Sequence, residues 1–238
     1  MQKAAIIGTG IAGMACAHFL RGKYELTIYE RNNYVGGHTN TVTVDEGGRE
    51  IPIDTGFMVY NEVTYPNLAK LFRDLGVPTM PTSMSFSVQH KPSGLEWCGT
   101  GISGLFAQRR NIFRPSFYRF LSEVNRFNRE SVRILDDPAS EGLSLEAYAI
   151  SRGYSDDFLE RYLVPMSSAV WSTDPSRMLD FPAVTLVRFF LNHGFLGLDT
   201  QHQWRTVVGG SRVYRDRLIA PFSGRIHCGR AALKVTRV

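Results

Sequence analysis

The chain has 238 residues, of which 43% are hydrophobic and 21% charged, so it can bury a sizeable core and lacks the composition of a disordered protein. Its formal net charge is +5, but the lysines and arginines are scattered, and we therefore expect no nucleic-acid partner. Its three cysteines form no disulfide framework by number and no metal site by spacing, which favours a reducing, cytoplasmic compartment.

The first predicted elements are a strand, a turn and a helix. Residues 4–7 form a short apolar run that ends at Gly8, and residues 11–20 carry the small and apolar side chains of a buried helix. Residues 25–29 then alternate and are rich in strand formers. This order predicts a βαβ-type unit with Glu30 at the carboxyl end of its second strand.

A hairpin and an amphipathic helix are predicted next. Two strand-like pieces, residues 41–44 and 51–53, flank a turn that contains two glycines, which favours an antiparallel hairpin. Pro66 precedes apolar residues at the three-and-four spacing of a helix that ends at Gly76. Residues 84–97 predict two further strands around a polar turn.

The middle third of the chain is predicted to be largely helical. Apolar residues recur at nearly helical spacing over 116–135, which indicates one long amphipathic helix. Further helical patterns cover 145–152, 156–171 with a kink or break at Pro165, and 182–192. Charged and polar residues interrupt even the most apolar stretch, so we expect no transmembrane segment.

Gly8, Gly10 and Gly13 have the GxGxxG spacing of a dinucleotide-binding loop between the predicted strand and helix. The first glycine permits a tight turn, and the second lets the backbone approach a pyrophosphate at the positive end of the helix. Glu30 has the position of a carboxylate that accepts hydrogen bonds from the ribose hydroxyls. NAD and FAD share these groups, so the loop alone leaves both open.

A glycine doublet follows this unit. Directly after Glu30 come Arg31, Gly36, Gly37 and His38, in the pattern E-R-x4-G-G-H. The pattern resembles the signature of the superfamily of flavin-containing amine oxidases, protoporphyrinogen oxidases and phytoene desaturases. The resemblance implies that the dinucleotide is FAD.

Two later stretches carry the same resemblance. D-T-G-F-M-V-Y-N occupies residues 54–61, and W-R-T-V-x-G-G-S at 204–211 is more weakly similar to a bacterial, FAD-dependent amine oxidase-like branch. The resemblance implies an α/β fold in which a Rossmann-like FAD-binding domain of the glycine-doublet type carries an inserted helical and antiparallel β substrate subdomain. We expect the first part at 1–65, the substrate subdomain at 66–205, and an incomplete return to the FAD-binding domain at 206–238.

The family roles transfer to this chain by motif position. The glycine loop would hold the pyrophosphate and Glu30 the ribose. The diphosphate and ribityl region would contact Arg31, Gly36, Gly37 and His38. Gly56, Phe57 and Met58 would approach the flavin ring. Val235, in a strand-like run that starts at residue 232, would contact the adenine through its backbone. The expected cofactor-binding residues are Gly8, Gly10, Ile11, Ala12, Gly13, Glu30, Arg31, Gly36, Gly37, His38, Thr39, Gly56, Phe57, Met58 and Val235.

The chain departs from the family pattern in two places. Many amine oxidases carry arginine where this chain has His38, so a neutral imidazole hydrogen bond replaces an ionic contact to phosphate and an amine is less strongly implied as the substrate. In the family, more of the substrate domain and a Gly-Asp motif at the flavin follow the region that ends here at Val238. We therefore expect a piece of a longer protein, with a cofactor site open on one side.

Tyr60, Trp171 and Trp204 are candidates for a substrate pocket, although large aromatic side chains more often fill ordinary cores. The leading hypothesis is an FAD-dependent oxidoreductase that transfers a hydride from a C–N or C–C bond of a small organic substrate to the flavin. Two alternatives stay open: a flavin-dependent desaturase or isomerase of a lipid or isoprenoid, and a non-catalytic FAD-binding fragment. A peripheral position at a membrane surface also stays open. We assign no catalytic side chain and no metal ligand, because the flavin supplies the redox chemistry.

Overall fold

The computed structural model describes residues 1–197 and 200–237, and the chain divides into two compact units. The first unit consists of Met1–Ser83 and Gln203–Val238, and the second of Met84–His202. The second unit is therefore inserted into the first along the chain. Each unit has its own core.

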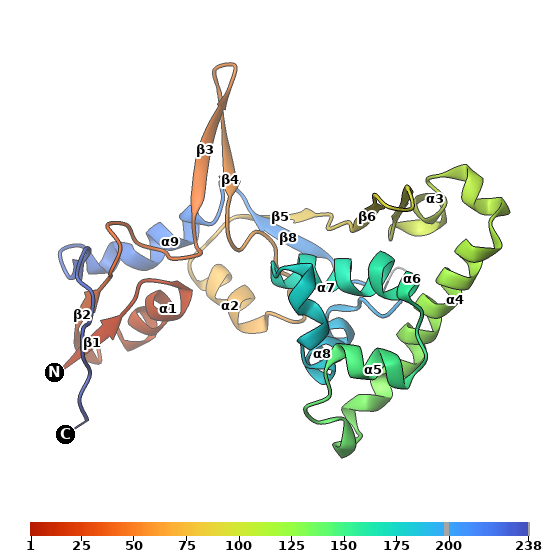
Figure 1. Cartoon of the computed structure of the whole chain (residues 1–238). Helices are drawn as coiled ribbons and strands as arrows, with labels where there is room; N and C mark the ends of the chain where they lie inside the picture. Colours follow the sequence, from red (N-terminus) through yellow and green to blue (C-terminus); the bar gives the residue numbers. More distant parts are fainter. Residues whose placement is uncertain (198–199, 238) are drawn as a thin grey trace. The chain divides into compact units, whose positions relative to one another are not determined.

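A small parallel sheet begins the first unit (Figure 1). Its strands are β1 (Gln2–Ile7), β2 (Tyr24–Tyr29) and β9 (Ile226–His227), in the order β1-β2-β9, and helix α1 (Ile11–Leu20) connects β1 to β2. Ala17 of this helix is fully buried against the sheet, because its small side chain allows a close approach. The predicted strand, turn, helix and second strand are confirmed.

The chain after β9 differs from the prediction. A strand was expected from residue 232, but residues 232–237 have no regular structure, and residue 238 lies outside the described part of the chain. Leu233 and Val235 are 95% and 78% exposed. A strand needs a neighbour for its backbone hydrogen bonds, and residues 232–237 pair with none of the described strands, whereas the short strand β9 pairs with β2.

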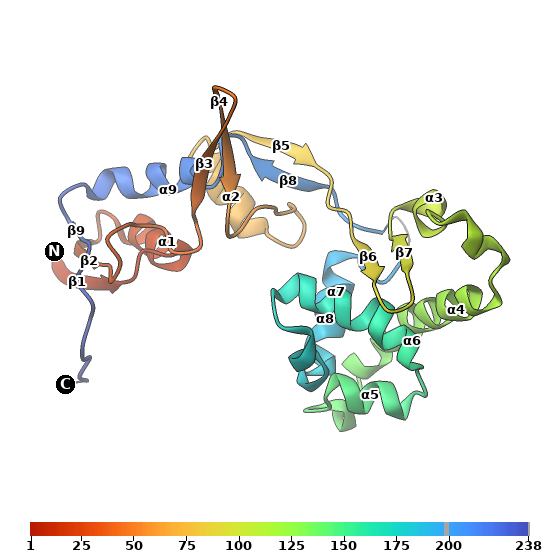
Figure 2. The ribbon, with the colours of Figure 1, turned by 45° about the horizontal axis from the view of Figure 1, so that its top comes forward.

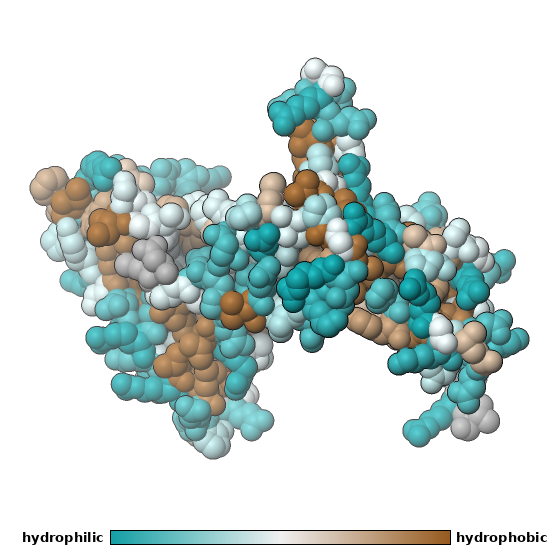
Figure 3. Space-filling view, turned by 180° about the vertical axis from the view of Figure 1, so that it is seen from behind, coloured by the Kyte–Doolittle hydropathy of each residue, from teal (hydrophilic) through white to brown (hydrophobic). Residues whose placement is uncertain are grey.

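The predicted hairpin is confirmed and projects from the first unit. Strands β3 (Thr41–Glu46) and β4 (Arg49–Asp54) pair in an antiparallel register that sets Val42 opposite Ile53. These side chains are partly exposed, at 41% and 44%, and apolar surface follows the hairpin beneath its polar tip (Figure 3). Asp54 is the last residue of β4 and lies at the base of the hairpin.

Helix α2 (Pro66–Asp74) packs in the core of the first unit rather than with the inserted subdomain. Its Phe72 ring lies 4.9 Å from the ring of Tyr214 in helix α9 (Arg212–Ile219), measured between centroids. Leu218 of α9 is fully buried in the same cluster. The inserted unit consequently begins after Ser83, whereas the sequence motifs predict a start at residue 66.

A second antiparallel pair lies where the chain leaves and re-enters the first unit. Strand β5 (Thr79–Thr82) pairs with β8 (Trp204–Val207), and Thr79 lies opposite Val207. The sequence did not predict this pairing, because the two strands are short and far apart along the chain. Short strands gain their stability from the pairing itself.

The second unit is a small hairpin with a set of helices (Figure 2). Its strands and helices are β6 (Ser87–His90), β7 (Leu95–Cys98), α3 (Gly101–Leu105), α4 (Pro115–Glu130), α5 (Leu145–Ser151), α6 (Asp156–Phe158), α7 (Val164–Trp171) and α8 (Ala183–His193). One π-helical turn, Leu159–Leu163, joins α6 to α7, and Pro165 lies in the first turn of α7. The predicted hairpin and the helical character of this region are confirmed, whereas at Pro165 the helical run continues without a break, after a π-helical turn.

Aromatic side chains build the core of this unit. Phe127 of α4 is fully buried, and its ring centroid lies 5.6–6.5 Å from those of five other aromatic residues. They are Tyr148, Tyr154, Phe158, Tyr162 and Phe190. The predicted apolar stripe of the long helix therefore faces the core.

Among the described residues, no helix has both the length and the apolar character needed to span a bilayer.

The core of the second unit should be far more sensitive to truncation than its surface. Phe127→Ala should lower the free energy of unfolding by about 3–5 kcal/mol, because it leaves a cavity among packed rings. Phe113→Ala is the matched control, since Phe113 is 85% exposed, and it should change stability by about 0.5 kcal/mol or less. Urea unfolding followed by tryptophan fluorescence measures both, and equal losses would contradict this packing.

Candidate functional site

The glycine loop lies between β1 and α1, at the carboxyl end of the parallel sheet. Gly8 has a φ of +93°, which side chains rarely adopt, and its N–H donates to the Tyr29 carbonyl at 2.8 Å. Gly10 is the N-cap of α1, and no side chain caps this helix end. The first turn of α1 also lacks acidic residues, so its free N–H groups and helix dipole favour an anion.

The second and third glycines of the loop serve different purposes. A Cβ on Gly13 would overlap the carbonyl oxygen of Gly8, so the packing of the loop on its own helix requires glycine there. A Cβ on Gly10 would meet no atom of the chain within 4 Å, and its φ of −62° suits any residue. The described chain therefore gives no internal reason for glycine at position 10.

The glycine doublet packs against this loop. Gly37 has a φ of +57°, and a Cβ on it would lie 3.3 Å from the Cα of Gly10. The N–H of Gly36 donates to the Thr9 hydroxyl at 3.2 Å, and its carbonyl accepts from Thr39 at 2.9 Å. The backbone of the glycine doublet thus packs directly against the backbone of the glycine loop at Gly10, without a side chain between them.

Glu30 holds the loop from beneath. Its side chain is buried, and its carboxylate accepts three hydrogen bonds, from the Thr9 N–H (2.8 Å) and hydroxyl (2.6 Å) at Oε2 and from the Asn32 N–H (2.9 Å) at Oε1. Burial acts to raise the pKa of Glu30, but the hydrogen bonds from Asn32 and Thr9 outweigh it and lower that pKa below its ordinary value. Glu30 is therefore ionised at neutral pH.

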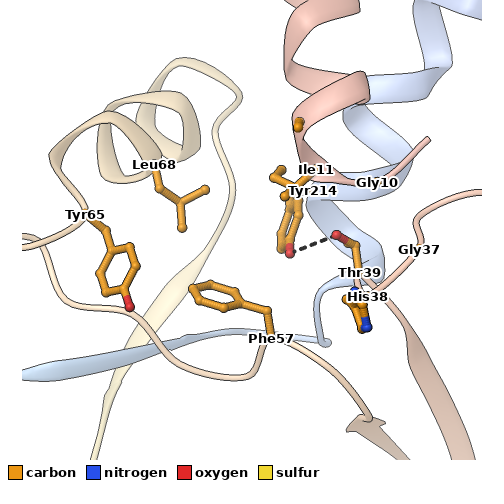
Figure 4. A pocket seen from close by; sticks show the side chains of 10 residues that line it. Gly10, Ile11, Gly37, His38, Thr39, Phe57, Tyr65, Leu68 and Tyr214 are labelled. Atoms are coloured by element: carbon orange, nitrogen blue, oxygen red, sulfur yellow. Dashed lines mark hydrogen bonds between the residues drawn. The ribbon is translucent and has the colours of Figure 1, made fainter. Parts of the chain in front are cut away.

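A cleft of about 540 Å³ opens beside the loop, within the first unit (Figure 4). Its lining residues are Gly10, Ile11, Ala12, Gly37, His38, Thr39, Phe57, Tyr65, Leu68 and Tyr214. The sequence predicted all of them except Tyr65, Leu68 and Tyr214. The sequence placed Leu68 on an amphipathic helix, and the other two carry no motif signal of their own.

The cleft has two chemically different sides. Gly10, Gly37 and His38 present backbone and an imidazole, whereas Phe57, Tyr65 and Leu68 present apolar and aromatic surface (Figure 4). The rings of Phe57 and Tyr65 meet edge to face, with centroids 5.9 Å apart. This arrangement suits a ligand that carries a phosphate at one end and a flat ring at the other.

Tyr214 ties helix α9 to the cleft. Its hydroxyl donates to the Thr39 hydroxyl at 3.4 Å (Figure 4). Burial raises the pKa of Tyr214, and burial also raises the pKa of Tyr65, so both phenols stay neutral at physiological pH. The cleft wall is consequently uncharged on this side.

Asp54 joins the two later motif stretches. Its Oδ1 accepts from the Ser211 N–H at 2.8 Å, the Ser211 hydroxyl at 2.8 Å and the Thr41 hydroxyl at 2.6 Å. A Cβ on Gly210 would crowd Thr41 and Asp54, so the G-G-S turn fits closely over the base of the hairpin. The stretches at 54–61 and 204–211 therefore form one structural unit that places α9 beside the cleft.

Several predicted cofactor residues lie outside the lining of the cleft. Gly8, Gly13, Glu30 and Gly36 shape or support the loop, as described above. A Cβ on Gly56 would overlap the His38 carbonyl oxygen, so a close backbone approach explains this glycine.

The other predicted residues away from the cleft are more exposed. Arg31 is exposed, Met58 is 58% exposed and Val235 is 78% exposed. None of the three belongs to the lining of the cleft.

The three candidate substrate residues are not gathered at this cleft. Tyr60 and Trp204 are 3% and 5% exposed and belong to the interior of the first unit. Trp171 is half-buried in the second unit, where its ring packs against Phe181 and Phe189. Their surroundings are those of packing residues.

The described residues contain no group of three or more His, Cys, Asp or Glu side chains arranged to hold a metal ion.

Comparisons with known proteins agree on the fold. Residues 6–75 match the family model described as an NAD(P)-binding Rossmann-like domain. Cyclohexylamine oxidase from Brevibacterium oxydans superposes over 96% of this chain and 51% of its own, with a TM-score of 0.68 and 20% identity. Wild-type putrescine oxidase bound to putrescine superposes over 95% of this chain and 50% of its own, also with a TM-score of 0.68 and 20% identity.

A third comparison is with a curated sequence. The 1-hydroxycarotenoid 3,4-desaturase of a Flavobacterium species is 46% identical over 43 residues, which are 18% of this chain and 9% of the desaturase. The chain spans about half the length of the solved structures that it matches. The predicted α/β fold, with a Rossmann-like domain and the architecture of amine oxidases, is confirmed.

The Glu30 hydrogen bonds predict a pH-dependent stability difference. Glu30→Gln should lower the free energy of unfolding by about 1–3 kcal/mol near pH 7. The amide NH₂ of glutamine replaces one carboxylate oxygen and cannot accept the hydrogen bonds that Thr9 or Asn32 donates to it. Since the folded pKa of Glu30 is lowered, its contribution is present above the unfolded pKa of about 4.3 and is lost as pH falls through the folded value.

The difference between wild type and Glu30→Gln should therefore shrink in acid. Urea unfolding at about pH 7 and about pH 4 measures it. Glu25→Gln, an exposed position of the same strand, is the matched control and should change stability little at either pH. If Glu30→Gln lowers the free energy of unfolding equally at both pH values, the ionised carboxylate is not the source of the stabilisation.

Proposed function

We propose that this chain binds FAD through its glycine loop and cleft, as part of an oxidoreductase that oxidises a C–N bond of an organic amine. One observation carries the proposal: the backbones of Gly10 and Gly37 lie close together at the uncapped start of α1. No atom of the described chain would obstruct a side chain at position 10, yet the residue there is glycine. The shared fold with cyclohexylamine oxidase and putrescine oxidase supports the amine as the substrate class.

The loop would bind the pyrophosphate of FAD through backbone N–H groups. The free amides of the first turn of α1 point along the helix axis toward an anion, and a side chain at Gly10 would occupy its place. His38 would add an imidazole hydrogen bond from the other side of the cleft. Both contacts orient the cofactor without charged side chains.

Glu30 would position the adenosine ribose. An ionised carboxylate has about four acceptor positions, and Thr9 and Asn32 use three of those of Glu30. The remaining acceptor capacity suits a ribose hydroxyl, and the negative charge disfavours a 2′-phosphate. The same hydrogen bonds that fix the loop would thus select the nucleotide.

The apolar side of the cleft would hold the ring of the cofactor and exclude water. Phe57, Tyr65 and Leu68 offer a flat, uncharged surface to it. When bound, the flavin supplies the redox chemistry by accepting the electrons of the substrate bond. We assign no acid or base among the described residues of the cleft.

A second candidate is the desaturation of a carotenoid-like lipid. The local identity to 1-hydroxycarotenoid 3,4-desaturase favours it, because that match is closer in sequence than those to the oxidases, although much shorter. His38, in a position where many amine oxidases have arginine, is compatible with both. For this candidate the protein would work at a membrane surface.

We also propose a cytoplasmic location and a division of labour between the units. Cys16, Cys98 and Cys228 are free thiols, as expected in a reducing compartment. The first unit would hold the cofactor, and the inserted second unit would contribute to the recognition of a small organic substrate.

Gly10→Ala should separate ligand binding from folding. The added methyl group meets no atom of the chain, so stability should stay within about 0.5 kcal/mol, while FAD affinity should fall at least about tenfold. Gly99→Ala is the matched control, since its Cβ would make ordinary contacts at 3.7 Å and 3.9 Å in the second unit. Quenching of FAD fluorescence by the whole chain measures affinity, and unchanged binding by Gly10→Ala would refute the loop assignment.

The two candidate reactions differ in what reduces the bound flavin. In anaerobic titrations of the FAD-loaded protein, cyclohexylamine or putrescine should bleach the visible flavin band if an amine is the substrate. A carotenoid dispersed in detergent should bleach it instead if the desaturase candidate is correct. Bleaching by the carotenoid alone would overturn the amine assignment, whereas no flavin uptake at all would overturn both.

A further inference from the structure

The second unit contains a hollow that the proposed function leaves without a role. Two adjoining cavities of about 90 Å³ and 200 Å³ share walls formed by Met84, Phe86, Met166, Phe195 and Gln201. All the lining residues belong to the second unit. The hollow therefore shares no lining residue with the cleft of the first unit.

Aromatic side chains form a fixed wall of the hollow. The Phe86 and Trp97 rings meet edge to face with centroids 5.9 Å apart, and Tyr162 lies 6.1 Å from Trp97. The indole N–H of Trp97 donates to the Arg161 carbonyl at 3.1 Å, and Trp97 is only 5% exposed. A wall held in this way is formed before any ligand binds.

The π-helical turn builds one side of the hollow. Tyr162 lies in this turn and Met166 in the helix that follows, and strand β6 packs beside the turn. π-Helical turns occur often at functional sites, although the turn alone would not define one. Here Tyr162 of the turn and Met166 of the following helix line the same cavity.

The polar side chains of the described lining are uncharged, and they are Ser85, Thr100, Asn128, Tyr162 and Gln201. The Tyr162 hydroxyl donates to Asn128 Oδ1 over a long 3.4 Å, and both residues line the smaller cavity. Burial raises the pKa of Tyr162, so the phenol stays protonated. The described lining contains no Asp, Glu, Lys, Arg or His, so none of its side chains offers an opposite charge to an ammonium or a carboxylate.

We propose that this hollow binds an uncharged small molecule with one ring and a hydroxyl or carbonyl group. An apolar cavity of about 150 Å³ in another protein holds benzene, so the larger cavity here has room for one ring with short substituents. The polar group of the ligand pairs with the Tyr162 hydroxyl and Asn128. Binding at this site does not depend on FAD.

The test uses the whole chain without FAD and three fluorinated probes followed by fluorine NMR. Fluorobenzene and 4-fluorophenol should bind, and 4-fluorobenzylammonium should bind at least about tenfold more weakly, because its charge is unpaired. Binding of the ammonium equal to or tighter than that of fluorobenzene would overturn the proposal. So would the absence of binding by both neutral probes.

Two variants locate the binding. Gly99→Leu adds a side chain to the smaller cavity next to the Trp97 ring, which a Cβ on Gly99 would approach at 3.9 Å, and it should weaken the binding of 4-fluorophenol, whose hydroxyl reaches that cavity, at least tenfold. Ala147→Leu adds the same bulk on the exposed surface of α5 and should leave binding unchanged. Unchanged binding of 4-fluorophenol by a folded Gly99→Leu would place the probe elsewhere and refute the site.

Tyr162→Phe gives an independent readout if Gly99→Leu does not fold. It should weaken 4-fluorophenol about fivefold, as expected for one lost hydrogen bond, and leave fluorobenzene unchanged. If Tyr162 had a purely structural role, Tyr162→Phe would change the affinities of both probes by the same factor. Equal effects on the two probes would therefore contradict the polar contact.

Discussion

The arrangement of the first unit depends on one buried carboxylate. Glu30 directly follows β2 and accepts hydrogen bonds from the N–H and hydroxyl of Thr9, in the middle of the glycine loop. The Thr9 hydroxyl in turn accepts from Gly36 in the glycine doublet. Loop, strand end and doublet are thereby held as one piece, and a change of charge at Glu30 would loosen all three.

The cleft needs a second support on its far side. Asp54, at the base of the hairpin, accepts hydrogen bonds from Ser211 at the start of α9. Tyr214 of α9 in turn donates a hydrogen bond to the Thr39 hydroxyl. Residues that are separated widely along the chain thus meet through a few charge-assisted or neutral hydrogen bonds. This explains why two short motif stretches accompany the glycine loop.

Local patterns predicted most elements of this fold and part of the site. The strand before Gly8, the helix after it and the apolar stripe around Phe127 were correct, because each depends on spacing within one segment. The pairing of β5 with β8 and the cleft residue Tyr214 were missed, because they depend on contacts across the chain. The strand expected from residue 232 was wrong, since a β pattern alone does not supply a partner strand.

The glycines show how a ligand site can be distinguished from a tight fold. Gly13 and Gly56 are required by backbone atoms that a Cβ would overlap, and they would be glycines even in a protein without a ligand. Gly10 has neither a crowded Cβ nor a positive φ, yet it lies at an uncapped helix start and lines the cleft. An anion that approaches the backbone at this helix start would give an external reason for glycine at position 10. For this reason the binding hypothesis depends on position 10 more than on the complete motif.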